Sequence, residues 1–377
     1  MNANTQALHA LGQSLWLDNI TRTMLDDGTL ARYIAELSVT GLTSNPTIFE
    51  HAIGHGDAYD EQIGELARAG KSGEELFFAL AIRDLGRAAD LFRPAHDASG
   101  GVDGWASLEV SPLLVDDTAG SIEAAARLHA AAARPNLFIK IPGTPAGARA
   151  IEESIFAGVP INVTLLFSRE QYLVAAEAYL RAIERRLEAG RDPRVASVAS
   201  LFVSRWDVAV KDQVPREQRN RLGIAIAKRT YRAYRDLLAS PRWVRLAQAG
   251  ARPQRMLWAS TGMKDPDGRD TLYIETLAAP DTIDTIPDKT LLAFADHGKV
   301  GSPMAVDGGD AEQTIAEFAR LGVDIDALAV RLQKEGGDAF KTSWGSLLDA
   351  IRKKSTQTAG AQRALIRALP SREYRPG

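Results

Sequence analysis

The chain has 377 residues, of which 45% are apolar and 25% are charged, and this composition is that of an ordinary globular protein, not of a disordered, collagen-like or coiled-coil chain. Its 45 basic and 48 acidic residues leave a net charge of -3, which excludes a global positive field for nucleic acid or an anionic membrane but allows a basic pocket for a small anion. Cysteine is absent, so a disulfide framework, a thiolate metal site and a cysteine nucleophile are excluded.

The N-terminal segment does not resemble a secretory signal. It has no Lys or Arg before Arg22 and no continuous apolar stretch. The longest uncharged apolar-rich stretch, residues 154–168, contains Pro160 and falls short of the ~20 residues that a membrane-spanning helix needs. We therefore expect a cytoplasmic protein.

Short apolar runs rich in β-branched residues alternate along the chain with longer amphipathic runs, a pattern typical of strand–helix units around a parallel sheet. The predicted strands are Leu15–Leu17, Val39–Thr43, Ala106–Val110, Leu137–Ile141, Ile161–Leu165, Val198–Val203, Met256–Ala259 and Tyr273–Thr276. The predicted helices between them are Thr21–Leu37, Ala58–Phe92, Ser121–Ala133, Ala146–Phe156, Arg169–Ala189 and Arg216–Leu238.

Eight strands with interposed helices fit a (β/α)8 TIM barrel of ~250 residues plus insertions, whereas a doubly wound sheet usually has fewer strands and a nucleotide-binding fingerprint. We expect residues 1–377 to form a single α/β domain of this type with additional helices. Residues 277–377 are expected to be a helical C-terminal extension packed on the barrel, because their apolar helix faces need a partner and no flexible linker separates them.

In such a barrel the functional site lies where strands end and the following loops begin. The polar residues at these positions form the set of candidates Asp18, Asn45, Glu109, Lys140, Asn162, Thr164, Ser200, Arg205, Ser260 and Lys264.

Lys140 is the strongest candidate for a catalytic residue, because this charged side chain interrupts the apolar run LFIKIP. Burial disfavours the ammonium form of a lysine, so an amine in this place becomes available as a nucleophile toward a carbonyl. The alternative is a charged residue that protects an exposed edge strand from aggregation. A closed barrel has no edges, which weakens that alternative.

Schiff-base chemistry also needs a carboxylate to move protons near the reacting carbons, and Asp18 and Glu109 are the candidates. Asp18 precedes a helical pattern and could equally be a helix cap. Glu109 lies inside a strand, where alternation places Leu108 and Val110 on the opposite face. It therefore points either to solvent or into a site.

Asn45 and Asn162 offer amide groups suited to a polyhydroxylated ligand. The alternative is an ordinary hydrogen bond in a turn or in the barrel interior, which is the more frequent role of a single Asn before a Pro. The sequence has no metal-ligand motif: His51 and His55 have the spacing of ligands on a helix, but Gly54 and Gly56 favour a surface turn there. We predict no metal site.

The blocks WLDNI, TGLTSNPTIF, SLEVSP, FIKIPGTPAGARAIE, GVPINVTLLFS, VASLFVSRWD and LWASTGMKDP resemble the transaldolase family, in the family's order, from residue 16 to about residue 266. The helical tail is similar to that of the longer bacterial members. The resemblance implies a class I aldolase barrel that needs no cofactor and acts on sugar phosphates in the pentose phosphate pathway. We expect a monomer or a homodimer.

The resemblance also implies roles for individual residues. Lys140 would form the Schiff base with the ketose donor, Asp18 would handle the C4 hydroxyl proton, and Glu109 with Thr164 would hold the water used in forming and hydrolysing the imine. The substrate-binding positions would be Asn45 and Asn162 for the dihydroxyacetone hydroxyls, Ser200 and Arg205 for the phosphate, and Lys264. Many members have Arg at this last position, and Lys lacks the bidentate fork of Arg.

The expected activity is transfer of a dihydroxyacetone unit from sedoheptulose 7-phosphate or fructose 6-phosphate to glyceraldehyde 3-phosphate or erythrose 4-phosphate. One alternative is a Schiff-base aldolase that releases free dihydroxyacetone, as the shorter fructose-6-phosphate aldolases do. Another is a non-catalytic sugar-phosphate binding barrel, which would keep Arg205 and Ser200 without needing Lys140, Asp18 and Glu109 together.

Overall fold

Eight short parallel strands close into a barrel in the computed structural model, which describes the backbone of residues 1–368 and the side chains of residues 1–357. Each strand pairs with its neighbour in the chain, and β8 pairs with β1. The strands are β1 Ser14–Leu17, β2 Val39–Thr43, β3 Trp105–Glu109, β4 Leu137–Pro142, β5 Ile161–Leu166, β6 Ser197–Phe202, β7 Gln254–Ala259 and β8 Thr282–Ile286. The predicted (β/α)8 barrel is confirmed, with β1 to β7 within two residues of their predicted bounds.

The predicted eighth strand was wrong. Tyr273–Thr276 belongs to a short helix, α13 (Leu272–Thr276), in which Tyr273 and Ile274 are buried. A short apolar run has the same appearance in a buried helix and in a strand, so periodicity cannot separate them. The true β8, with the sequence TIDTI, lies in the segment expected to be the helical extension, so residues 277–377 include the last barrel strand.

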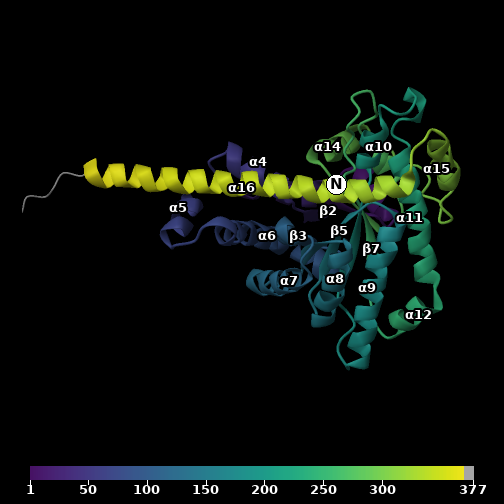
Figure 1. Ribbon diagram of the computed structural model, residues 1–377, viewed down its shortest axis with the longest axis horizontal. Coiled ribbons are helices and arrows are strands. Elements are labelled where there is room, and N and C mark those ends of the chain that lie inside the picture. The colour runs from purple at the N-terminus through teal and green to yellow at the C-terminus, as the bar shows by residue number, and fades with distance from the viewer. Residues whose placement is uncertain (369–377) are drawn as a thin grey trace, which may run out of the picture.

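Helices surround the barrel (Figure 1). Their bounds are α1 Ala3–Ala10, α2 Arg22–Asp26, α3 Thr29–Glu36, α4 Pro46–His55, α5 Asp60–Arg68, α6 Gly73–Ala98, α7 Thr118–Ala132, α8 Pro145–Ala157, α9 Arg169–Glu188, α10 Ser204–Val210, α11 Leu222–Ala239, α12 Pro241–Gln248, α14 Asp288–His297, α15 Ala311–Arg320 and α16 Ile325–Ala368. Two short 3-10 turns, Pro112–Leu114 and Arg216–Gln218, lie between them.

The helical patterns predicted for residues 21–37 and 58–92 each divide into two helices. Gly28 and Gly70 have φ angles of 76° and 86°, a left-handed conformation that interrupts a right-handed helix and that glycine adopts without strain. The segment with His51 and His55 is helical (α4), not a turn, and the two imidazole rings stack with their centroids 4.5 Å apart.

Alternation along the strands turns every second residue into the barrel interior. In its lower part the rings of Trp105 and Phe138 stack with centroids 4.0 Å apart. Nearer the carboxyl ends of the same strands, the inward positions are Glu109, four residues after Trp105, and Lys140, two residues after Phe138, and the two form a buried ion pair. This aromatic pair lies below the ion pair, and at the amino-terminal end of the barrel the buried side chain of Ser14 hydrogen-bonds to those of Asp103 and Arg255. Glu109 and Lys140 thus lie toward the carboxyl ends of the strands, where sites of this fold form.

The longest helix, α16, runs across the molecule in Figure 1 and extends past α5. It contacts α4, α5, α6 and the end of β5. Among the described residues no helix, including this one, combines the length and the apolar character needed to cross a membrane.

Candidate active site

A pocket opens at the carboxyl ends of the barrel strands and collects most of the predicted site. Of the ten strand-end candidates, eight line it: Asp18, Asn45, Lys140, Thr164, Ser200, Arg205, Ser260 and Lys264. The other two, Glu109 and Asn162, do not line the pocket but hydrogen-bond to residues that do. Residues from separate strands therefore meet at one place.

Lys140 lies at the floor of this pocket and is only 5% exposed. Its Nζ donates hydrogen bonds to Glu109 Oε2 and to the Ser44 carbonyl, each over 2.9 Å. Parallel pairing of β3 with β4 places Glu109 directly beside Lys140, and the sheet is closed. The edge-strand alternative for Lys140 is therefore excluded.

Glu109 faces the barrel interior, while Leu108 and Val110 belong to the outer core cluster, as the alternation predicts. Burial raises the pKa of Glu109, and the nearby Lys140 ammonium opposes that rise. Its second oxygen, Oε1, is buried without a hydrogen-bond partner among the described residues, and so is Thr164 Oγ1. Buried polar atoms of this kind are costly unless a ligand or water engages them.

Asp18 follows β1 and is held in place by its backbone, whose N–H donates to the Ile286 carbonyl over 2.7 Å. It is not a helix cap, because Thr21 caps the following helix by accepting from the Met24 N–H. Burial raises the pKa of Asp18, and the charge of Lys140 and a 3.3 Å hydrogen bond from Thr43 Oγ1 oppose the rise.

Asn162 lies beneath the pocket and is fully buried in a hydrogen-bond chain. Its Oδ1 accepts from Ser200 Oγ over 2.7 Å, and its Nδ2 donates to Ser107 Oγ over 3.2 Å. Asn45 lines the pocket, but its Oδ1 accepts from the Ile48 N–H as the cap of α4. Both residues thus have the structural roles that the sequence left open, in addition to their place at the site.

The cationic candidates lie at the outer part of the pocket. Arg205 is in the first turn of α10, and its guanidinium makes no hydrogen bond or ion pair within the described part of the chain. Its Cζ lies 5.2 Å from the centroid of the Phe202 ring, and burial lowers its pKa. Lys264 is exposed on the loop after β7 and also lines the pocket.

Several pocket residues were missed by the predictions. Thr43 and Thr285 line the pocket from β2 and β8, and their hydroxyl oxygens are 2.8 Å apart. Thr43 ends a correctly predicted strand, so the strand-end rule could have found it. Thr285 lies on β8, and it was missed because the eighth strand was predicted at the wrong place. Phe340 reaches the pocket from α16, and no local sequence signal connects it with the strand ends.

Asp284 is a buried carboxyl on β8 outside the predicted site. Its Oδ1 accepts from Thr261 Oγ1 over 2.8 Å, and its Oδ2 has no partner among the described residues. Burial raises its pKa to about 7, whereas in the unfolded chain the pKa returns to about 3.9. The folded state therefore binds this proton more tightly, and the stabilisation it gives is complete below pH ~4 and is lost as the pH rises through about 7.

Asp284→Asn removes this titration while keeping an acceptor for Thr261. We expect the free energy of unfolding of the unsubstituted protein to fall, relative to the variant, by about 2–3 kcal/mol between pH 5 and pH 8. Urea unfolding of both proteins at the two pH values measures the difference. Parallel stability profiles would contradict a raised pKa at Asp284.

The chain is similar to known proteins over most of its length. The sequence model of the family described as Transaldolase/Fructose-6-phosphate aldolase matches residues 15–351. The chain is similar to a transaldolase of Thiobacillus denitrificans, 45% identical over 355 residues that cover 92% of this chain and 99% of the relative. A transaldolase of Parafrankia sp. is 45% identical over 356 residues, covering 92% and 96%. One of Renibacterium salmoninarum is 41% identical over 373 residues, covering 96% and 100%.

Proposed function

The chain belongs to the transaldolase and fructose-6-phosphate aldolase family and is a transaldolase, an enzyme of the transferase class. We propose that it transfers a dihydroxyacetone unit through a Schiff base on Lys140. The observation that carries the proposal is the buried amine of Lys140, 2.9 Å from the Glu109 carboxylate, at the floor of a pocket that Asp18 also lines. A nucleophile, a proton acceptor beside it and a second carboxyl across the pocket are the groups that this chemistry needs.

The reaction begins when the Lys140 amine attacks the ketone carbon of a ketose phosphate. Glu109 is placed to accept the proton that the ammonium must lose, and its raised pKa makes it a competent base. The carbinolamine then loses water to give an iminium ion. The unpaired Glu109 Oε1 and Thr164 Oγ1 support a role for these two groups in holding that water.

Carbon–carbon cleavage follows from the iminium ion. Asp18 takes the proton of the C4 hydroxyl, the C3–C4 bond breaks, and its electron pair moves into the iminium to form an enamine on Lys140. The aldehyde product leaves, and the enamine attacks the carbonyl of an acceptor aldose, whose new alkoxide regains the proton from Asp18. Hydrolysis of the iminium releases the product, so we expect ping-pong kinetics.

The substrates we propose are sugar phosphates. The Arg205 guanidinium has no hydrogen-bond or ion-pair partner within the described part of the chain, and its planar donors suit a phosphate. Lys264 would add a point charge, and Ser200 a hydroxyl, at the same pocket. The amide group of Asn45 would contact a hydroxyl of the bound three-carbon unit. Asn162, predicted for the same role, lies beneath the pocket and would act through its hydrogen bond with Ser200.

We propose sedoheptulose 7-phosphate or fructose 6-phosphate as donors and glyceraldehyde 3-phosphate or erythrose 4-phosphate as acceptors. We also propose that the protein is cytoplasmic, that it needs no cofactor for this reaction, and that it acts as a monomer or homodimer. The balanced charge of the chain favours small molecules over nucleic acid or membrane as partners. We further propose that the chain folds as a single domain, with the segment that follows the barrel packed on it.

Borohydride reduction in the presence of fructose 6-phosphate, followed by peptide mass mapping, tests the proposal. We expect an adduct with the mass of dihydroxyacetone on the peptide that contains Lys140. Product analysis without an acceptor separates the two activities of the family, because a transaldolase retains the three-carbon unit and an aldolase releases it. A protein that binds the sugar phosphate without forming any adduct would be a binding barrel, and the Schiff-base mechanism would fail.

A further inference from the structure

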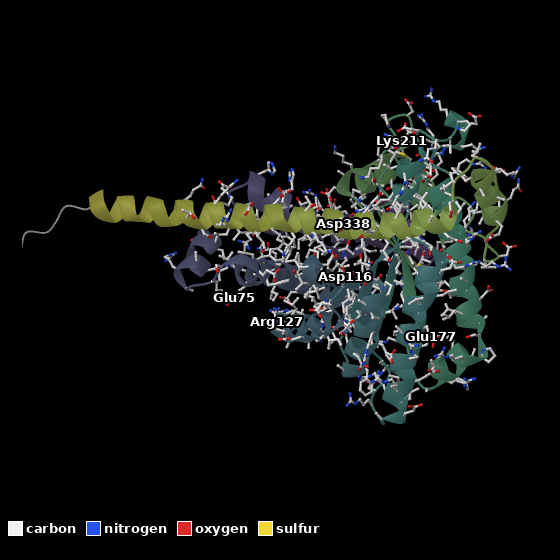
Figure 2. All side chains as sticks on the ribbon, in the orientation of Figure 1. Glu75, Asp116, Arg127, Glu177, Lys211 and Asp338 are labelled. Atoms are coloured by element: carbon white, nitrogen blue, oxygen red, sulfur yellow. The ribbon has the colours of Figure 1, made fainter. Side chains whose placement is uncertain are left out.

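The C-terminal helix α16 is fixed to the strand ends that carry the catalytic groups. Gln333 Nε2 donates to the carbonyl of Gly143 over 3.0 Å and to that of Leu165 over 2.9 Å. Gly143 follows β4, the strand of Lys140, and Leu165 is the neighbour of Thr164 on β5. The following residues of α16 are therefore held over the pocket. Asp338, labelled on α16 in Figure 2, marks this part of the helix.

At Gly336 the helix backbone approaches Arg205 closely. A Cβ atom at this position would lie 3.1 Å from Arg205 Nη1 and 3.0 Å from Leu165 Cδ2, which is tighter than ordinary van der Waals contact. The glycine is buried in the middle of a long helix, where it costs about 1 kcal/mol relative to alanine. Space for the guanidinium is a physical reason for a glycine at this position.

One turn further along, Phe340 places its ring in the pocket wall. The ring is 5% exposed, and its centroid lies 5.9 Å from Arg205 Cζ. The Phe202 ring lies at 5.2 Å from the same carbon. Apolar surfaces and cation–π contacts thus orient the guanidinium, and its five N–H donors are not used in hydrogen bonds within the described part of the chain.

We propose that α16 determines the specificity for phosphorylated substrates, because Gly336 and Phe340 hold the Arg205 guanidinium in the orientation that binds the phosphate group. The proposal rests on the proposed function, which supplies the sugar-phosphate donor. Gly336 and Phe340 are positioning residues: they act through Arg205 and not on the reacting carbons. The unphosphorylated part of the substrate should therefore bind independently of them.

The test compares glycine substitutions at two positions of the same helix. Gly336→Ala and Gly336→Val place side-chain atoms against Arg205, whereas at Gly345 an added Cβ meets nothing within 4 Å. Gly345→Ala and Gly345→Val are thus matched controls for changes in helix propensity. Circular dichroism and thermal unfolding verify that all four variants are folded.

We expect the KM for fructose 6-phosphate to rise roughly threefold in Gly336→Ala and roughly tenfold in Gly336→Val, with kcat nearly unchanged. Borohydride trapping of dihydroxyacetone, which has no phosphate, should reach half-saturation at the same concentration in all variants. Phe340→Leu, which removes the ring, should raise the KM for fructose 6-phosphate as well, and by more than Phe340→Tyr, which keeps the ring.

Three results would overturn the inference. In the first, the Gly336 and Gly345 variants have the same KM for fructose 6-phosphate. In the second, the Gly336 variants lose trapping of dihydroxyacetone as strongly as binding of fructose 6-phosphate, so that α16 supports the whole site and not the phosphate. In the third, the unsubstituted protein forms no adduct with either compound. This last result would disprove the proposed function itself, and the inference, which depends on that function, would be disproved with it.

Discussion

Lys140→Ala is expected to abolish transfer, with a loss in kcat of at least about 10⁴-fold. The variant lacks the amine that forms the iminium, and no other lysine among the described residues lines the floor of the pocket, since Lys264 is exposed on an outer loop. Coupled measurement of aldehyde production from fructose 6-phosphate gives the rate. Borohydride trapping should give no adduct on the variant protein.

The substitution also disturbs the buried ion pair, so its control has to separate chemistry from folding. Removal of Lys140 leaves the Glu109 carboxyl buried without its partner, 5% exposed, and breaking such a pair costs about 3–5 kcal/mol. The double variant Lys140→Met with Glu109→Gln keeps the side-chain volumes and buries no charge. It should be folded and equally inactive. Appreciable transfer by either folded protein would contradict the Schiff-base role of Lys140.

Asp18→Asn is expected to slow carbon–carbon cleavage by about 10²–10⁴-fold, the usual contribution of a general base. The amide keeps the shape of the carboxylate and can still accept from Thr43 Oγ1, which lies 3.3 Å from Asp18 Oδ1. It cannot take the proton of the C4 hydroxyl. Formation of the iminium depends on Lys140 and Glu109, so it should continue in this variant.

The mass of the trapped adduct distinguishes these two steps. In the unsubstituted protein, borohydride should trap the three-carbon enamine as its reduced iminium. In Asp18→Asn, the intact six-carbon sugar phosphate should accumulate on Lys140, because the bond-breaking step has become slow. A three-carbon adduct that forms at the unsubstituted rate would show that Asp18 does not handle this proton.

The two carboxyls have different surroundings, which is consistent with different roles. Glu109 forms an ion pair with Lys140 and has one free oxygen, whereas Asp18 hydrogen-bonds to Thr43 and lies near the charges of Lys140 and Lys264. Burial raises the pKa of both groups. Paired titratable groups in unlike environments are the usual basis for dividing acid and base roles.

The sequence by itself was sufficient for most of the barrel and of the site. Short apolar strands and amphipathic helices are local patterns, and they predicted β1 to β7 closely. The strand-end rule then found eight residues that line one pocket. It worked because parallel strands of a closed barrel end at one rim, so that positions far apart in the chain need no further information to converge.

Tertiary structure decided the remaining parts. The strand β8, with the sequence TIDTI, has polar residues on both faces because Thr285 faces the pocket and Asp284 hydrogen-bonds to Thr261, so it lacks the apolar run by which strands are recognised. Phe340 reaches the pocket only because α16 folds back over the strand ends. Such long-range packing depends on how whole elements fit together, and a local window of sequence carries no information on it.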